Sequence, residues 1–259
     1  TASGITSHNG NAFIVGTTTN SSMWDPDDYD PTNEIRPQLK LQGGFNPWSR
    51  DAFVARLDPD GHLLNLTFIG GNNTEEGAAI ALDASDNIYI TGQTDSFDFP
   101  ASGNAWQGDL ATPPLSESGV DGFVAKLPAD GSTLLYGTYF DFSNFADTGS
   151  CPPSGPPDSD TGCYFHYREF PGGIAVNGSH IYVSGVADAD TPVVPSPAGQ
   201  IVPPAVDTSK EGAFVVDLTN PSALEQGDQS NVHFFGGSFD TGAEAYLTDV
   251  VAANNKVYV

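Results

Sequence analysis

Short runs of alternating apolar and polar residues recur along the chain, and turn-forming residues separate them. In residues 122–127, Phe123 and Ala125 fall on one face and Val124 and Lys126 on the other, as expected of a half-buried strand. No long amphipathic helical period is present, so the pattern predicts an all-β protein. In the best-defined group, strands are expected over residues 79–82, 87–92, 122–127 and 134–139.

Two phrases return at intervals. DAFVARLDPDG, residues 51–61, recurs as DGFVAKLPADG, residues 121–131, and in shorter form as GAFVVDL, residues 212–218. A second phrase has four copies, of which DASDNIYITG is one. The aromatic residues Phe13, Tyr89, Tyr182 and Tyr258 mark the same position in these copies. The chain therefore divides into three repeats and the start of a fourth, at about residues 1–77, 78–170, 171–245 and 246–259.

Each repeat supplies four short strands, and four antiparallel strands are typical of a β-propeller blade. We expect a β-propeller built of four-stranded antiparallel blades, with three blades and the start of a fourth in this segment. The long connections, at residues 17–50, 93–120 and 186–211, fall on one face. Binding would be sought there, although these loops could equally thicken the shell. Asp51 and Arg56, within the recurring strand, are expected at edge and surface positions.

The phrases DAFVARLDPDG, DGFVAKLPADG and DASDNIYITGQTDSFDFP, with the GG after TFI and HFF, resemble the SBBP repeat family, a seven-bladed β-propeller-type repeat. The resemblance implies a propeller in secreted or cell-surface proteins, and it offers no catalytic motif. The long acidic loops, the cysteine-bearing loop and the degraded third copy depart from the family. Closed propellers typically have about 4 to 8 blades, so we expect a longer parent chain or completion by another chain.

The net charge limits the classes of partner that the chain could bind. The chain has 33 acidic and 8 basic residues, a formal net charge of −25, which disfavours nucleic acid and anionic lipid. Calcium binding, adaptation to salt and a solubilising acidic surface all remain open. The densest acidic group makes a candidate calcium site, although Asp30 and Arg36 break the EF-hand pattern. Its candidate ligands are Asp25, Asp27, Asp28 and Asp30.

The cysteines and the candidate glycosylation sites indicate the cellular location of the protein. Cys151 and Cys163 flank a Pro/Gly-rich segment and are expected to form a disulfide, with free thiols or metal ligation helped by His166 as alternatives. A disulfide favours an extracellular or cell-surface location. Four candidate N-glycosylation sites, whose number alone is weak evidence, stand at Asn20, Asn65, Asn72 and Asn177. No apolar run approaches the roughly 20 residues of a membrane span.

Three tryptophans lie in the long loops of the same expected face. Trp24, Trp48 and Trp106 could stack on sugar rings, or each could cover its own blade. Familiar nucleophile, metalloprotease and phosphate-binding motifs are absent from the sequence.

The sequence therefore favours a structural or adhesive extracellular glycoprotein without catalysis, a unit of a filament or matrix that contacts its own copies or neighbouring surface proteins. It needs no cofactor unless calcium binds. A glycan- or protein-binding module is the alternative, and a propeller enzyme with its site in further blades is the third.

Overall fold

The computed structural model describes residues 1–19, 39–41, 49–108, 120–140, 169–187, 212–218, 232–235, 249–253 and 256–259. Every regular element within these ranges is a β-strand. The predicted all-β class is confirmed. No helix in the described ranges is both long and apolar enough to cross a membrane.

The first sheet is an antiparallel meander, and a short strand joins its far edge in parallel. Asn9 and Gly10 form the first two-residue turn, and both have positive φ, as a hairpin turn that matches strand twist requires. The sheet order is β1 (Ala2–His8), β2 (Asn11–Thr18), β4 (Asp51–Leu57), β5 (Leu63–Ile69) and β3 (Leu39–Leu41).

The second and third sheets repeat the four-stranded antiparallel meander. The second contains β6 (Glu75–Leu82), β7 (Ile88–Thr94), β8 (Asp121–Leu127) and β9 (Tyr136–Phe140). These confirm the four strands predicted in this repeat, with β6 starting earlier than expected. The third contains β10 (Glu169–Asn177), β11 (His180–Ala187), β12 (Gly212–Asp217) and β13 (Val232–Phe235), and a two-stranded sheet follows with β14 (Val251–Ala253) and β15 (Lys256–Tyr258).

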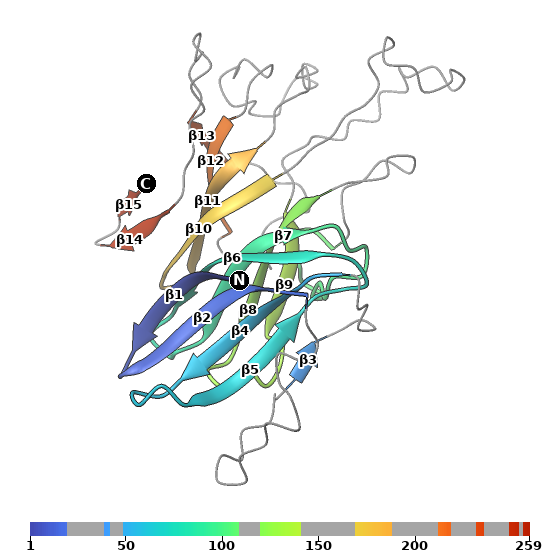
Figure 1. The fold of residues 1–259 in the computed structure, drawn as a ribbon. Coiled ribbons are helices and arrows are strands. Elements are labelled where there is room, and N and C mark those ends of the chain that lie inside the picture. Colours follow the sequence, from blue (N-terminus) through green and yellow to red (C-terminus); the bar gives the residue numbers. More distant parts are fainter. Residues whose placement is uncertain are drawn as a thin grey trace, which may run out of the picture.

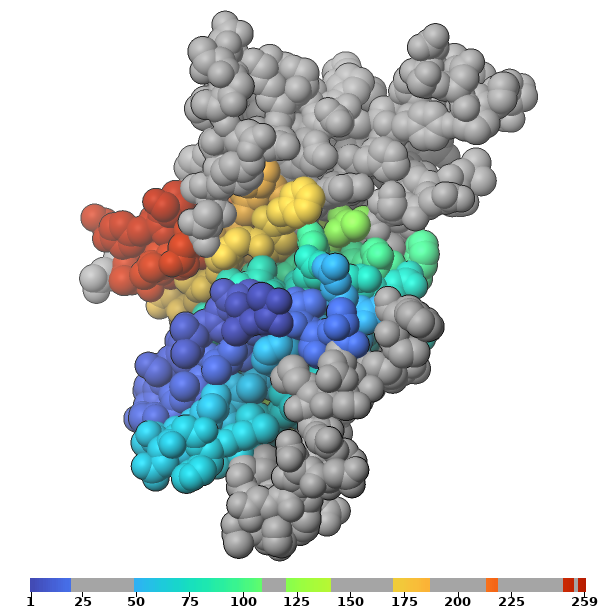
Figure 2. All heavy atoms as spheres, viewed as in Figure 1, coloured from blue at the N-terminus to red at the C-terminus, as the bar shows by residue number. Residues whose placement is uncertain are grey.

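The sheets follow one another in space in the order of the sequence (Figure 1), and the surface view shows the same succession of colours (Figure 2). Phe123 and Ala125 of β8 pack into a core shared with the first sheet, whereas Val124 packs into a core shared with the third. The expectation that this strand is buried on one face only is therefore wrong. Because a sheet lies on each side of it, both of its faces are covered along most of the strand.

The recurring phrases have a common packing reason. Gly16, Gly92 and Gly185 occupy equivalent positions in β2, β7 and β11, each directly opposite the phenylalanine of the next strand in its sheet. A Cβ at Gly92 would lie 2.0 Å from the Glu76 carbonyl oxygen and 2.8 Å from the Phe123 ring. In each sheet, the first strand has a register shift opposite this glycine. The backbone of that strand therefore lies too close to the glycine to leave room for a side chain.

Each of the three predicted repeats contributes most of one such sheet, although β6 and β10 begin a few residues before the predicted repeats at residues 78 and 171. The described part of the chain shows no closed ring, so the arrangement of the sheets around a propeller axis stays a prediction.

Candidate functional site

Two acidic side chains are buried where the first and second sheets meet. Asp51 is the first residue of β4 and Glu75 the first of β6, and they are 4% and 0% exposed. A Cβ at Gly70 would lie 2.3 Å from Glu75 Oε2 and 2.7 Å from Asp51 Oδ1. Glu75 Oε2 and Asp51 Oδ1 therefore lie close to each other. We call Asp51 and Glu75 the carboxyl pair, and glycine is required at residue 70 to leave it room.

Hydrogen-bond donors surround the Glu75 carboxyl group. The Thr94 hydroxyl donates to Oε1 at 2.6 Å, and the Gly71 backbone N–H donates to Oε2 at 2.9 Å. Burial and, as a smaller cause, the negative charge of Asp51 raise the pKa of Glu75 from its ordinary value of 4.5 to about 7, although hydrogen bonds from Ser96, Thr94 and Gly71 act in the opposite direction. This carboxyl group therefore titrates near neutral pH.

The expectation that Asp51 and Arg56 occupy edge and surface positions is wrong for both. Asp51 is buried at the start of β4, close to Glu75 of the second sheet. Arg56 is half-buried: its guanidinium lies 5.4 Å from the centre of the Phe13 ring and donates to the Ala129 carbonyl at 3.2 Å. A signal was present in the sequence, because an acid stands at the same position of the second copy. That residue, Asp121, is 1% exposed and accepts a hydrogen bond from Gln107.

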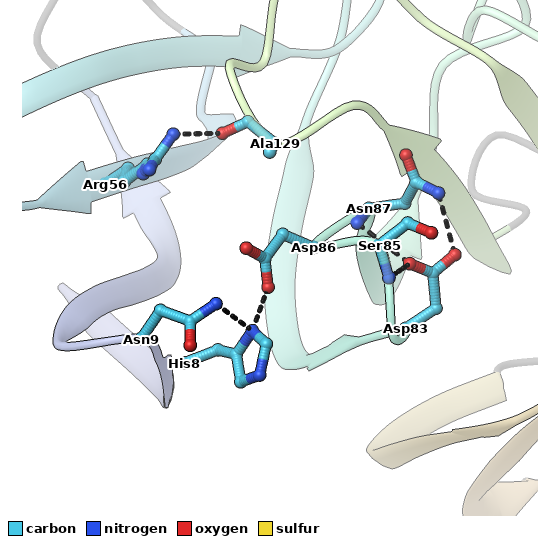
Figure 3. A network of polar contacts seen from close by, with 8 residues as sticks. All are labelled: His8, Asn9, Arg56, Asp83, Ser85, Asp86, Asn87 and Ala129. Carbon is cyan, nitrogen blue, oxygen red and sulfur yellow. Dashed lines mark hydrogen bonds and ion pairs between the residues drawn. The ribbon is translucent and has the colours of Figure 1, made fainter.

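A second group of polar side chains lies at the end of β6 that is opposite the carboxyl pair. There the β1–β2 turn of the first sheet meets the β6–β7 turn of the second sheet (Figure 3). His8 Nδ1, at the end of β1, contacts the Asp86 carboxylate in the β6–β7 turn. Within that turn, Asp83 accepts from the backbone N–H groups of Ser85 and Asn87 at 2.9 and 3.0 Å, which holds the turn closed. The group therefore connects turns, and its carboxylates already have partners.

The β4–β5 turn holds an exposed group that could take a cation. Ligand atoms of Asp58, Asp60 and His62 all lie within 4.8 Å of one another. The side-chain hydrogen bond between Asp58 and His62 lowers the pKa of Asp58 and raises the pKa of His62. Asp58 also accepts the backbone N–H groups of Asp60 and His62, at 2.9 and 2.8 Å. These hydrogen bonds hold the three side chains of the turn close together.

Trp106 is placed where it cannot stack on a sugar. It is 1% exposed and packs in the core between the second and third sheets, with Phe140 and Phe214. Its backbone N–H donates to the Tyr136 hydroxyl at 3.1 Å, which holds the segment after β7 against β9. The hypothesis of a glycan-stacking surface at Trp106 is corrected on this ground: the indole covers its own sheet.

Among the expected glycosylation sites, Asn72 is exposed, whereas Asn65 and Asn177 are half-buried. The Asn72 side-chain amide donates to Asp98 Oδ2 at 2.5 Å. The other predicted positions lie outside the described residues, namely Asn20, Trp24, Trp48, Cys151, Cys163 and the calcium candidates Asp25, Asp27, Asp28 and Asp30.

No protein-family model matches the chain, and a search of curated proteins finds no match either.

Proposed function

We propose that this chain is a structural or adhesive β-propeller segment of the cell surface or extracellular space, a unit of a filament or matrix without catalysis. One observation carries the proposal: several polar side chains at the junction of the first two sheets make contacts from one sheet to the other. The carboxyl pair is buried at the junction of the first two sheets, and His8 joins their turns through Asp86. Within the described residues, the contacts of these side chains suit a structural role.

Further polar contacts support this use. The Thr67 hydroxyl of the first sheet donates to the Gly131 carbonyl in the β8–β9 turn at 2.9 Å, and Arg56 donates to Ala129 in the same turn. Arg50 pairs with Glu76 across the other end of the junction. Repetition of one sheet joined by such bonds suits a rigid extended or circular scaffold. The resemblance to SBBP repeats favours the propeller arrangement and a secreted or surface location.

The proposal also accommodates the charge. A net charge of −25 keeps a surface-exposed protein soluble and repels anionic partners. Contacts with other copies would then depend on apolar sheet faces or on screening of the charge. Calcium bridging through exposed acids, such as the Asp58, Asp60 and His62 turn, is a secondary route to the same assembly.

Solution scattering and negative-stain microscopy of the chain over a concentration series test the proposal. Rods or filaments that grow with concentration, and that shorten when calcium is chelated if calcium bridges copies, are the expected result. A compact particle of one size at every concentration, with or without calcium, contradicts self-assembly. A screen of glycan and peptide binding on the same sample distinguishes the binding-module alternative, because selective binding without self-assembly favours that alternative.

A further inference from the structure

The junctions between successive sheets repeat one packing arrangement. The first strand of the later sheet lies chiefly against the first two strands of the sheet before it: β6 contacts β1 and β2, and β10 contacts β6 and β7. At each junction the later sheet contributes a row of buried apolar side chains that are paired across its strands, which we call the inserting row. The inserting row consists of Ile80, Ile90 and Ala125 in the second sheet and of Ile174, Val183 and Val216 in the third.

The first sheet carries the same row on its outer face. Ile5 pairs with Ile14, and Ile14 pairs with Ala55, in the register that the second sheet repeats. Ile5 is nevertheless 70% exposed, whereas its counterpart Ile80 is 9% exposed. Ile14 is half-buried, and its apolar cluster consists, among the described residues, of first-sheet side chains alone. The β1–β2 part of this inserting row therefore lacks the sheet that covers its counterparts.

The surface that receives an inserting row is marked by the aromatic residue of the second strand. Phe13 is 0% exposed and packs with the row of the second sheet, and Tyr89 is 4% exposed and packs with the row of the third. Tyr258 of β15 holds the same position and pairs with Val251 of β14. These two side chains are 53% and 54% exposed. They form a receiving face that carries no inserting row from the described residues.

The third sheet accounts for the other side of this hairpin. Val250 is 3% exposed, and a Cβ added at Gly173 of β10 would lie 2.7 Å from the Val250 backbone nitrogen. Because successive side chains of an extended segment point to opposite sides, Val251 and its partner Tyr258 point away from the third sheet.

We propose that copies of this chain join head to tail, with β1 of one copy packed on β14 and β15 of another as β6 packs on β1 and β2. The two faces lie at opposite ends of the series of sheets, blue for β1 and red for β14 and β15 (Figures 1 and 2). Because the two faces differ, each added copy leaves one of each open, so the contact continues as a filament or closes as a ring. This inference rests on the structural function proposed above and specifies its contact.

Sedimentation of variants over a concentration series tests the contact, in about 0.3 M sodium chloride to screen the net charge. Ile5→Asp and Tyr258→Asp each place a charge on one of the two faces, at positions exposed enough for the fold to be retained. Each should weaken self-association about tenfold or more, because an apolar side chain can no longer be buried. Phe97→Asp is the matched control: Phe97 is 68% exposed, lies after β7 and belongs to neither face, so this variant should assemble like the wild-type chain.

A mixture of the two face variants decides between head-to-tail contact and contact between like faces. Each variant keeps the face that the other has lost, so the mixture should form one-to-one pairs and nothing larger. Folding of each is checked by circular dichroism, and a serine variant at the same position replaces one that does not fold. Absence of pairs between folded variants overturns the head-to-tail contact.

Two further outcomes separate this contact from the structural function itself. If the wild-type chain assembles and Ile5→Asp and Tyr258→Asp assemble equally well, the contact is overturned while the structural function stands. If the wild-type chain stays monomeric at every concentration, both the contact and the proposed self-assembly are overturned.

Discussion

At the scale of single residues, glycines and acids set the limits of this fold. Gly16, Gly92 and Gly185 admit a bulged neighbouring strand and the ring of a facing phenylalanine. Gly70 leaves space for the carboxyl pair. Glycine is needed at these positions because it has no side chain. At each of them a Cβ would lie closer than van der Waals contact to backbone or buried atoms.

Gly92→Ala should therefore destabilise the chain by about 3 kcal/mol or more, since its methyl group would overlap the Glu76 carbonyl, an atom that cannot move away alone. Thermal and urea unfolding measure the loss. Gly103→Ala is the control, because a Cβ there has nothing within 4 Å. Equal stability of the two variants contradicts the packing role of Gly92.

At the scale of elements, the third strand of the second sheet is buried on both faces. In β8, Phe123 faces the first sheet, Val124 faces the third, and Lys126 lies 4.8 Å from the centre of the Tyr89 ring opposite it. The first sheet repeats this last pair with Arg56 over Phe13. The recurring phrase thus encodes one strand with two buried faces and a cation that covers an aromatic ring.

Contacts between an element of one sheet and a turn of the next can be tested at Thr67. Thr67→Val keeps the volume but removes the donor to Gly131, and we expect a loss of about 1 to 3 kcal/mol because both atoms are buried. Thr67→Ser keeps the hydroxyl and should recover the part of the loss that the bond explains. If the serine variant is less stable than the valine variant, packing of the methyl group outweighs the hydrogen bond.

At the scale of the whole molecule, the sheets are joined in sequence and the net charge opposes their compaction. With a formal charge of −25, mutual repulsion among surface acids reduces the stability of the folded chain near neutral pH. Salt screens this repulsion over a distance of about 10 Å at 0.1 M.

Raising sodium chloride from about 0.01 M to 0.3 M should therefore raise the melting temperature at pH 8. The same titration at pH 4, near the isoelectric point of about 4.1, is the control, and it should give little change because the net charge is small. The same rise at both pH values would show that salt acts by another route than screening.

The sequence alone determined the all-β class and the repeated four-strand group, because alternation of side chains and turn residues are local properties of the chain. The strands of the second repeat, including 122–127, could be predicted for this reason. Local pattern could not show what covers each face. Asp51 and Arg56 were therefore expected at the surface, although Asp51 is buried close to Glu75 and Arg56 is half-buried and donates to the β8–β9 turn.

Trp106 shows the same limit, since an aromatic residue in a loop can point outward or inward. Only the tertiary structure decided that its indole is buried and that Asp51 and Glu75 meet. The physical reason is that both outcomes depend on contacts between residues far apart in sequence, whose burial is set when one sheet packs on the next.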